Sequence, residues 1–181
     1  VCNVIINTPG SVAPAPAELE FRSFFSPEWA RTVMYQHWNE KPHRFGLFSE
    51  SGKARPLYFV FQMFSCLGEE RLQSSSLLPD VTTLAARANG KISTLVVNYD
   101  PEESQDRIVK IHFSHLQPGA RRLTAYRIDD DHHWSEEALE LTPIDERTVD
   151  VLADFEYQFY SPADSVLWVT LDPAIDIRSA V

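Results

Sequence analysis

Cysteine, glycine and long hydrophobic runs are all scarce in this sequence, and each scarcity excludes a class of protein. The two cysteines, Cys2 and Cys66, are too few for a disulfide-rich scaffold or a metal site with four cysteine ligands, and whether they form one bridge is left open. The 6 glycines are scattered, so no glycine-rich loop could hold a phosphate. No apolar run approaches the roughly 20 residues of a membrane-spanning helix. We therefore expect neither a cofactor nor a membrane partner.

Positive charge is scarce as well. The 181 residues include 16 Lys and Arg against 26 Asp and Glu, which gives a formal net charge of −10. Nucleic acids and anionic membrane surfaces would repel such a protein, so we expect no nucleic-acid partner. Hydrophobic residues make up 44% and aromatics 12%, which is typical of a packed globular protein. Since the chain begins with Val1 and carries no signal segment, we expect it to be a processed or excised piece of something longer.

The pattern of the chain changes near residues 73–80, from helical before the break to strands after it. Residues 1–7 form a short apolar run that predicts a buried strand. Ser26-Pro27-Glu28 is typical of a helix start, and a second helix is predicted from Pro56. Apolar residues surround most of that second helix, and Gly68 is expected to cap its C-terminus.

Alternating apolar and polar residues dominate the part after the break. Period two continues from Val149 to Phe159, which predicts one unusually long strand. Further strands are predicted at residues 92–98, 107–113, 121–128 and 166–171. Val109, Ile111 and Phe113 should share a buried face. The fold class expected is mainly β, an antiparallel β-sandwich with two N-terminal helices, divided into residues 1–72 and 73–181.

The densest set of candidate metal ligands is Asp129-Asp130-Asp131-His132-His133. Carboxylates would suit calcium and imidazoles would suit zinc. Contiguous residues rarely converge on one ion, however, and the spacing of a calcium loop is absent, so a solvated loop and no metal site are predicted. Trp134 follows this acidic loop and is the tryptophan whose neighbours indicate exposure. It could stack on a sugar ring, although a lid over the end of the sandwich is the commoner role.

Trp38-Asn39-Glu40 has the Asn-Glu pattern found at the acid/base residue of glycosidases. Those enzymes need two carboxylates about 5–10 Å apart, with the motif at the end of a barrel strand. Here the motif ends an amphipathic helix, which favours coincidence, and a nucleophile partner is left open among Glu18, Glu20 and Glu50. A serine hydrolase is not indicated, because no Gly-x-Ser-x-Gly elbow is present.

A more specific pattern runs through residues 44–72. Phe45-Gly46-Leu47 stands where a short strand would lie, Arg55-Pro56 opens a helix and Leu67-Gly68 closes it. In this order and spacing the motifs resemble the end of the catalytic barrel in glycoside hydrolase family 39, which includes β-xylosidases and α-L-iduronidases. Arg55 stands where that family usually has Lys.

The resemblance continues to residue 134 in three further motifs. These are Leu95-Val96-Val97-Asn98-Tyr99, then Leu116-Gln117-Pro118-Gly119, then Tyr126-Arg127-Ile128-Asp129 followed by His132 and Trp134. The resemblance implies that residues 44–72 are the last unit of a (β/α)8 barrel. The remainder would be the β-sandwich that packs against that barrel.

A complete barrel needs roughly 200–250 residues, so this chain should lack the family's catalytic glutamate pair. The function implied is therefore that of the C-terminal part of a two-carboxylate glycosidase, structural or accessory to the barrel. Its partners would be the remainder of the barrel, in the same parent chain or a companion chain, and an oligo- or polysaccharide. Asp129, His132 and Trp134 would then contact substrate. Family analogy implies secretion or a periplasmic location.

Two alternatives stay open. The chain could be a freestanding β-sandwich module that binds carbohydrate through exposed aromatics such as Trp134. It could also be a small complete hydrolase with Glu40 as its acid. The sugar, the linkage and the stereochemical outcome of hydrolysis are left open by the sequence.

Overall fold

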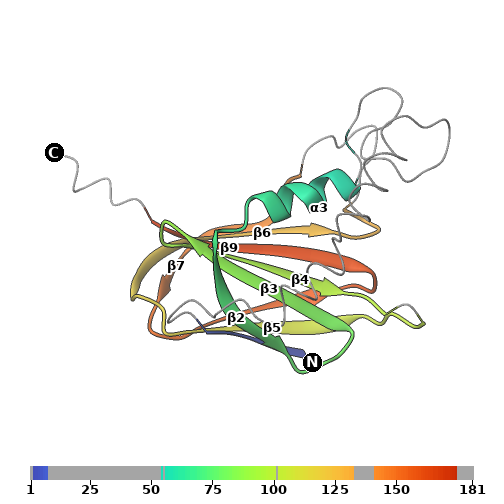
Figure 1. The fold of residues 1–181 in the computed structure, drawn as a ribbon, viewed down its shortest axis with the longest axis horizontal. Helices are drawn as coiled ribbons and strands as arrows, with labels where there is room; N and C mark the ends of the chain where they lie inside the picture. The colour runs from blue at the N-terminus through green and yellow to red at the C-terminus, as the bar shows by residue number, and fades with distance from the viewer. Residues whose placement is uncertain (1, 8–53, 55, 101, 133–140, 175–181) are drawn as a thin grey trace.

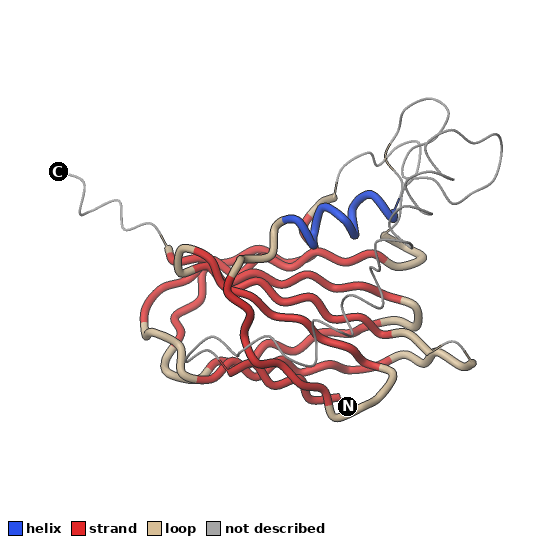
Figure 2. Tube along the Cα trace, viewed as in Figure 1, coloured by secondary structure: helices blue, strands red, loops and turns tan. Residues whose placement is uncertain are grey.

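Nine strands and one helix occur in the residues that the computed structural model describes, which are 2–7, 54, 56–100, 102–132 and 141–174. The helix is α3 (Pro56–Ser65). The strands are β1 (Cys2–Asn7), β2 (Glu70–Ser76), β3 (Val81–Ala88), β4 (Lys91–Asn98), β5 (Arg107–Ser114), β6 (Gly119–Ile128), β7 (Pro143–Val151), β8 (Phe155–Ser161) and β9 (Ser165–Pro173). Figure 2 shows the strands in red and α3 in blue on one side of them. Within these residues no helix is long and apolar enough to cross a membrane.

The strands belong to a single sheet in the order β7-β6-β9-β4-β3-β2-β1-β5-β8. Neighbours are antiparallel except β1 and β5, which are parallel. The sheet curls until it is nearly closed, and Figure 1 shows the β6, β9 and β4 layer facing the β5 layer with β2 running between them. The mainly β prediction is confirmed, but the antiparallel two-sheet sandwich is corrected to one mixed sheet. Alternation reveals which face of a strand is buried, but not that β1 joins the two layers.

Apolar side chains from both layers fill the space inside the curled sheet. Val109, Ile111 and Phe113 of β5 are at most 1% exposed and share the inner face, as the alternation predicts. Each such side chain contributes about 1.5–3 kcal/mol through removal of apolar surface from water. At the far ends of the strand order, the Tyr157 hydroxyl of β8 is hydrogen-bonded to Asp145 of β7, and burial raises the pKa of Tyr157 to about 12. This contact links the two end strands.

A second apolar cluster lies on the outer face of the sheet, beneath α3. Phe59 and Met63 of the helix pack against Leu95, Ile128 and Trp168 of the strands. Because both faces of β4 are covered, five consecutive residues of that strand are buried. The helix begins at Pro56 as predicted. The other predicted helix, which begins at Ser26, lies outside the described residues, so one helix is found where two were expected. The proposed division at residues 72 and 73 stays a prediction.

Gly68 does not cap α3 in the predicted way. The helix ends at Ser65, and Gly68 is not among the residues with positive φ in the described part of the chain. A Cβ at Gly68 would lie 2.2 Å from the carbonyl carbon and oxygen of Arg87 in β3. The glycine is therefore needed for a close approach between two backbone segments, since no side chain fits there.

The long strand predicted from Val149 to Phe159 is wrong. The chain forms β7 and β8, which lie at opposite ends of the strand order, and residues 152–154 carry it across the gap between them. Leu152 is 74% exposed in this connection. Both strands turn alternate residues toward the same core, so the period of two continues through the break. The strands predicted at residues 1–7, 92–98, 107–113, 121–128 and 166–171 are confirmed, whereas the short strand expected at residues 45–47 lies outside the described residues. Both cysteines are free, Cys2 buried and Cys66 exposed.

Replacing Gly68 tests the close approach to β3. We expect Gly68→Ala to lower the free energy of unfolding by about 2 kcal/mol or more, because overpacking against rigid backbone forces the strand to move. Chemical denaturation followed by far-UV circular dichroism measures this change. Glu69→Ala is the matched control, because Glu69 is exposed and next to Gly68. Equal stability of the two variants would contradict this account of Gly68.

Candidate functional site

The candidate site predicted from the sequence lies where β6 ends. Asp129 follows the last residue of β6, and its side chain is only 2% exposed. Its Oδ1 accepts hydrogen bonds from the backbone N–H groups of Asp131 and His132, at 3.0 and 2.7 Å. The Asp129 carboxylate thus stabilises the turn that residues 129–132 form. The prediction of a solvated loop is wrong for Asp129, because three consecutive aspartates do not reveal which side chain is buried.

Two side chains pair with the buried carboxylate. The Arg127 Nε atom forms an ion pair with Asp129 Oδ2, and His132 Nδ1 lies 2.8 Å from Asp129 Oδ1. Burial alone would raise the pKa of Asp129, but the hydrogen bonds from His132 and the charge of Arg127 outweigh it and lower the pKa below the ordinary value of 3.8. Asp129 is therefore ionised at neutral pH.

The ionised carboxylate fixes the histidine. Because Asp129 Oδ1 can only accept a hydrogen bond, His132 donates from Nδ1. Nε2 is therefore the ring nitrogen that does not contact the carboxylate. The His132 side chain is 40% exposed, and Nε2 has no partner among the residues whose placement is described. The arrangement can present an imidazole nitrogen to a ligand in a fixed orientation.

Arg127 ties this loop to β8. Its Nη1 donates a hydrogen bond to the backbone carbonyl oxygen of Tyr160, at 3.1 Å, and its Nη2 lies 3.3 Å from His132 Nδ1. The loop after β6 is thereby joined to an end strand of the sheet. Arg127 belongs to one of the family motifs in the sequence, but it was not predicted to be part of the site. The signal was its position two residues before Asp129, which places opposite charges on one side of the strand.

Of the predicted site residues, the structure brings Asp129 and His132 together. Trp134, Glu40 and the three alternative nucleophile glutamates lie outside the described residues. In the part of the chain that is described, no group of three His, Cys, Asp or Glu side chains could hold a metal ion.

Asn98, which stands in one of the family motifs, is structural. Its side chain is fully buried, and Nδ2 lies within hydrogen-bond distance of three carbonyl oxygens, those of Gln105 (2.9 Å), Ser161 (3.2 Å) and Pro162 (2.7 Å). It joins the end of β4 to the loop before β5 and to the turn between β8 and β9. This motif residue therefore holds three segments together.

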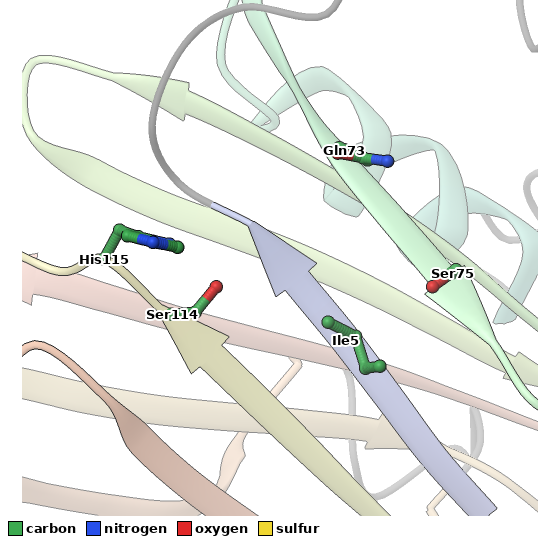
Figure 3. Close-up of a pocket in the computed structure, with 5 residues that line it drawn as sticks. All are labelled: Ile5, Gln73, Ser75, Ser114 and His115. Atoms are coloured by element: carbon green, nitrogen blue, oxygen red, sulfur yellow. The ribbon is translucent and has the colours of Figure 1, made fainter.

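A pocket of about 200 Å³ opens on the outer face of β1, β2 and β5. Figure 3 shows its lining residues on these strands and just beyond β5, namely Ile5, Gln73, Ser75, Ser114 and His115. None of these five residues is a carboxylic acid. The pocket as described therefore does not supply the two carboxylates that glycoside hydrolysis needs.

Comparisons with solved structures match this fold. A monomeric β-xylosidase from Caulobacter crescentus CB15 is similar with a TM-score of 0.60 and 19% identity, over 72% of this chain and 33% of that one. A family 39 glycoside hydrolase from Xanthomonas axonopodis pv. citri has a TM-score of 0.62 and 17% identity, over 72% and 32% of the two chains. The bacterial orthologue of human α-L-iduronidase has a TM-score of 0.60 and 16% identity, over 69% and 28%.

The structural neighbours are thus family 39 β-xylosidases and α-L-iduronidase relatives, which confirms the predicted resemblance at the level of the fold. The chain spans about a third of the length of these structures. No family model and no curated protein matches the sequence.

Neutralising Asp129 tests the account of the loop. We expect Asp129→Asn to lower the free energy of unfolding at pH 7 by about 3 kcal/mol, because Arg127 then loses the partner of a buried ion pair. The folded-state pKa of Asp129 is lowered, so its stabilisation is full above the ordinary value of 3.8 and is lost as pH falls through the folded-state pKa. The stability difference between the two proteins should therefore shrink below about pH 4.

Urea denaturation at a series of pH values measures this difference. Asp130→Asn is the control, since Asp130 is exposed and adjacent. A stability difference for Asp129→Asn that stays constant down to the lowest pH would contradict the assigned role of the carboxylate.

Proposed function

We propose that this chain is the accessory β part of a two-carboxylate glycosidase, and that it packs against a catalytic (β/α)8 barrel. The observation that supports the proposal most is the fold match to family 39 enzymes over about 72% of this chain and only about a third of theirs. The remaining two thirds of such an enzyme has room for a barrel of roughly 200–250 residues. In this proposal residues 44–72 are the last unit of that barrel.

The position of α3 supports the same function. A barrel helix has an apolar side that must be covered, and here Phe59 and Met63 of α3 lie against Trp168 and its neighbours on the sheet. The Trp168 ring in turn stacks on Tyr126, with ring centroids 4.9 Å apart. We infer that α3 belongs to the barrel and that its contact with β4, β6 and β9 fixes the angle between the two parts.

The loop after β6 has its own role in this proposal. Asp129 and Arg127 fix His132, and Trp134 stands two positions later in the sequence. In this proposal the segment is directed toward the sugar site, where His132 and Trp134 contact substrate. Asp129 acts through His132 as a positioning residue. The barrel supplies the acid and the nucleophile, and the bond cleaved is glycosidic.

The native molecular context tests this proposal. Size-exclusion chromatography of the source material, followed by denaturing mass spectrometry, should find this sequence in a longer parent chain or together with a companion of barrel size. That species should hydrolyse nitrophenyl β-xyloside or a related glycoside. A lone 20.7 kDa species would contradict the proposal.

The isolated chain gives a second, independent check. We expect it to hydrolyse none of these glycosides, because the catalytic carboxylates lie in the barrel, and Glu40→Gln should leave the rate of the whole assembly unchanged. The control is the unsubstituted assembly under the same conditions. Activity of the isolated chain that Glu40→Gln abolishes would favour the small complete hydrolase instead. Sugar binding without activity, by a chain that occurs alone, would favour the freestanding module.

A further inference from the structure

An exposed aromatic side chain lies on the strand that Arg127 joins to the loop after β6. Tyr160 of β8 is 47% exposed, and its hydroxyl donates a hydrogen bond to Asp106 Oδ2 at 2.5 Å. Asp106 Oδ1 accepts a second hydrogen bond from the backbone N–H of Ala163, at 3.0 Å. The ring is thereby held both at its strand and at its hydroxyl while much of its surface remains in water.

The same end of the molecule holds the fixed imidazole. Arg127 contacts the Tyr160 backbone with Nη1, and its Nη2 lies next to His132. On the neighbouring strand β5, the cross-strand partner of Tyr160 is Ile108, which is also partly exposed. The Arg127 guanidinium therefore lies between the Tyr160 main chain and the His132 imidazole, while Asp106 holds the Tyr160 hydroxyl.

The hydrogen bond from Arg127 to β8 does not require the tyrosine ring. Arg127 is bonded to the main-chain oxygen of Tyr160, which any residue would supply, and the ring projects from the outer face of β8. Its partner Asp106 is likewise exposed, in the loop before β5. A held but uncovered aromatic side chain has already lost the rotamer freedom that binding would otherwise cost.

We propose that Tyr160, Asp106 and His132 form a contact site for a neutral pyranose unit of an oligosaccharide. The ring of Tyr160 stacks on the apolar face of the sugar, Asp106 accepts a hydroxyl hydrogen and His132 Nε2 bonds a second hydroxyl. The choice of a carbohydrate rests on the proposed function. The choice of a neutral one comes from the site, because Asp106, Asp131 and the net charge of −10 repel a uronate, while Asp129 already neutralises Arg127.

Isothermal titration of the full 181-residue chain with xylohexaose tests the site. We expect Tyr160→Ala to weaken binding by about tenfold, a typical loss for a removed aromatic contact. Tyr99→Ala is the matched control, because Tyr99 is similarly exposed at 54% but lies at the end of β4, and it should bind as the unsubstituted chain does. If Tyr160→Ala does not fold, Tyr160→Leu keeps an apolar side chain on β8 and removes the aromatic face.

The charge preference is tested with an oligogalacturonate of equal length. Xylohexaose should bind more tightly at pH 7, and tighter binding of the oligogalacturonate would overturn the neutral assignment. No binding of xylohexaose by the folded chain, or equal binding by the Tyr160 and Tyr99 variants, would overturn the site itself. Failure of the folded chain to bind xylohexaose does not contradict the proposed function if a barrel companion is found. Binding lost with Tyr160 in a chain that has no barrel companion would support the site and contradict the accessory role.

Discussion

The insertion of β1 between β2 and β5 is the contact on which the rest of the structure depends. Its backbone is hydrogen-bonded to β2 on one side and to β5 on the other, so six residues join the two layers into one sheet. Cys2, Val4 and Ile6 turn inward and are fully buried in the main core. Without β1 the strand order would separate into a six-stranded piece and the pair β5–β8.

Local pattern was enough to predict most strands, because one buried face imposes a period of two whatever the partner strand is. The partner is a different matter. Nothing in residues 2–7 indicates a parallel neighbour, because the partner of a strand is a distant segment that only the tertiary structure brings beside it. The break between β7 and β8 could not be predicted either, because both strands face one core and the alternation of apolar residues continues through the break. Gly68 was expected to cap the C-terminus of α3, whereas the structure places it against the backbone of Arg87 in β3.

The candidate site was predictable in part. Asp129 and His132 are three positions apart, and the sequence placed both in one loop. Burial of Asp129 could not be read from three consecutive aspartates, because the inward residue is selected by Arg127 and by the direction in which β6 ends. Tyr160 and Asp106 come from β8 and from the loop before β5, and only tertiary structure brings them toward Arg127. The motif residue Asn98 is explained by the three carbonyl groups that it joins.

The parallel pairing of β1 with β5 also determines how the chain can fold. β1 precedes every other described strand, yet neither of its neighbours exists until much later in the chain, with β5 roughly 100 positions on, a separation that slows folding. Its apolar residues must wait unpaired during synthesis, when exposed strands are prone to mispairing. Within the two layers the strand pairs β2–β3, β3–β4 and β6–β7 are local hairpins, whereas β8 returns to pair with β5 and β9 returns beside β4 and β6. Because β1 and β5 are so far apart in the sequence, we expect closure of the sheet around β1 to come late in folding.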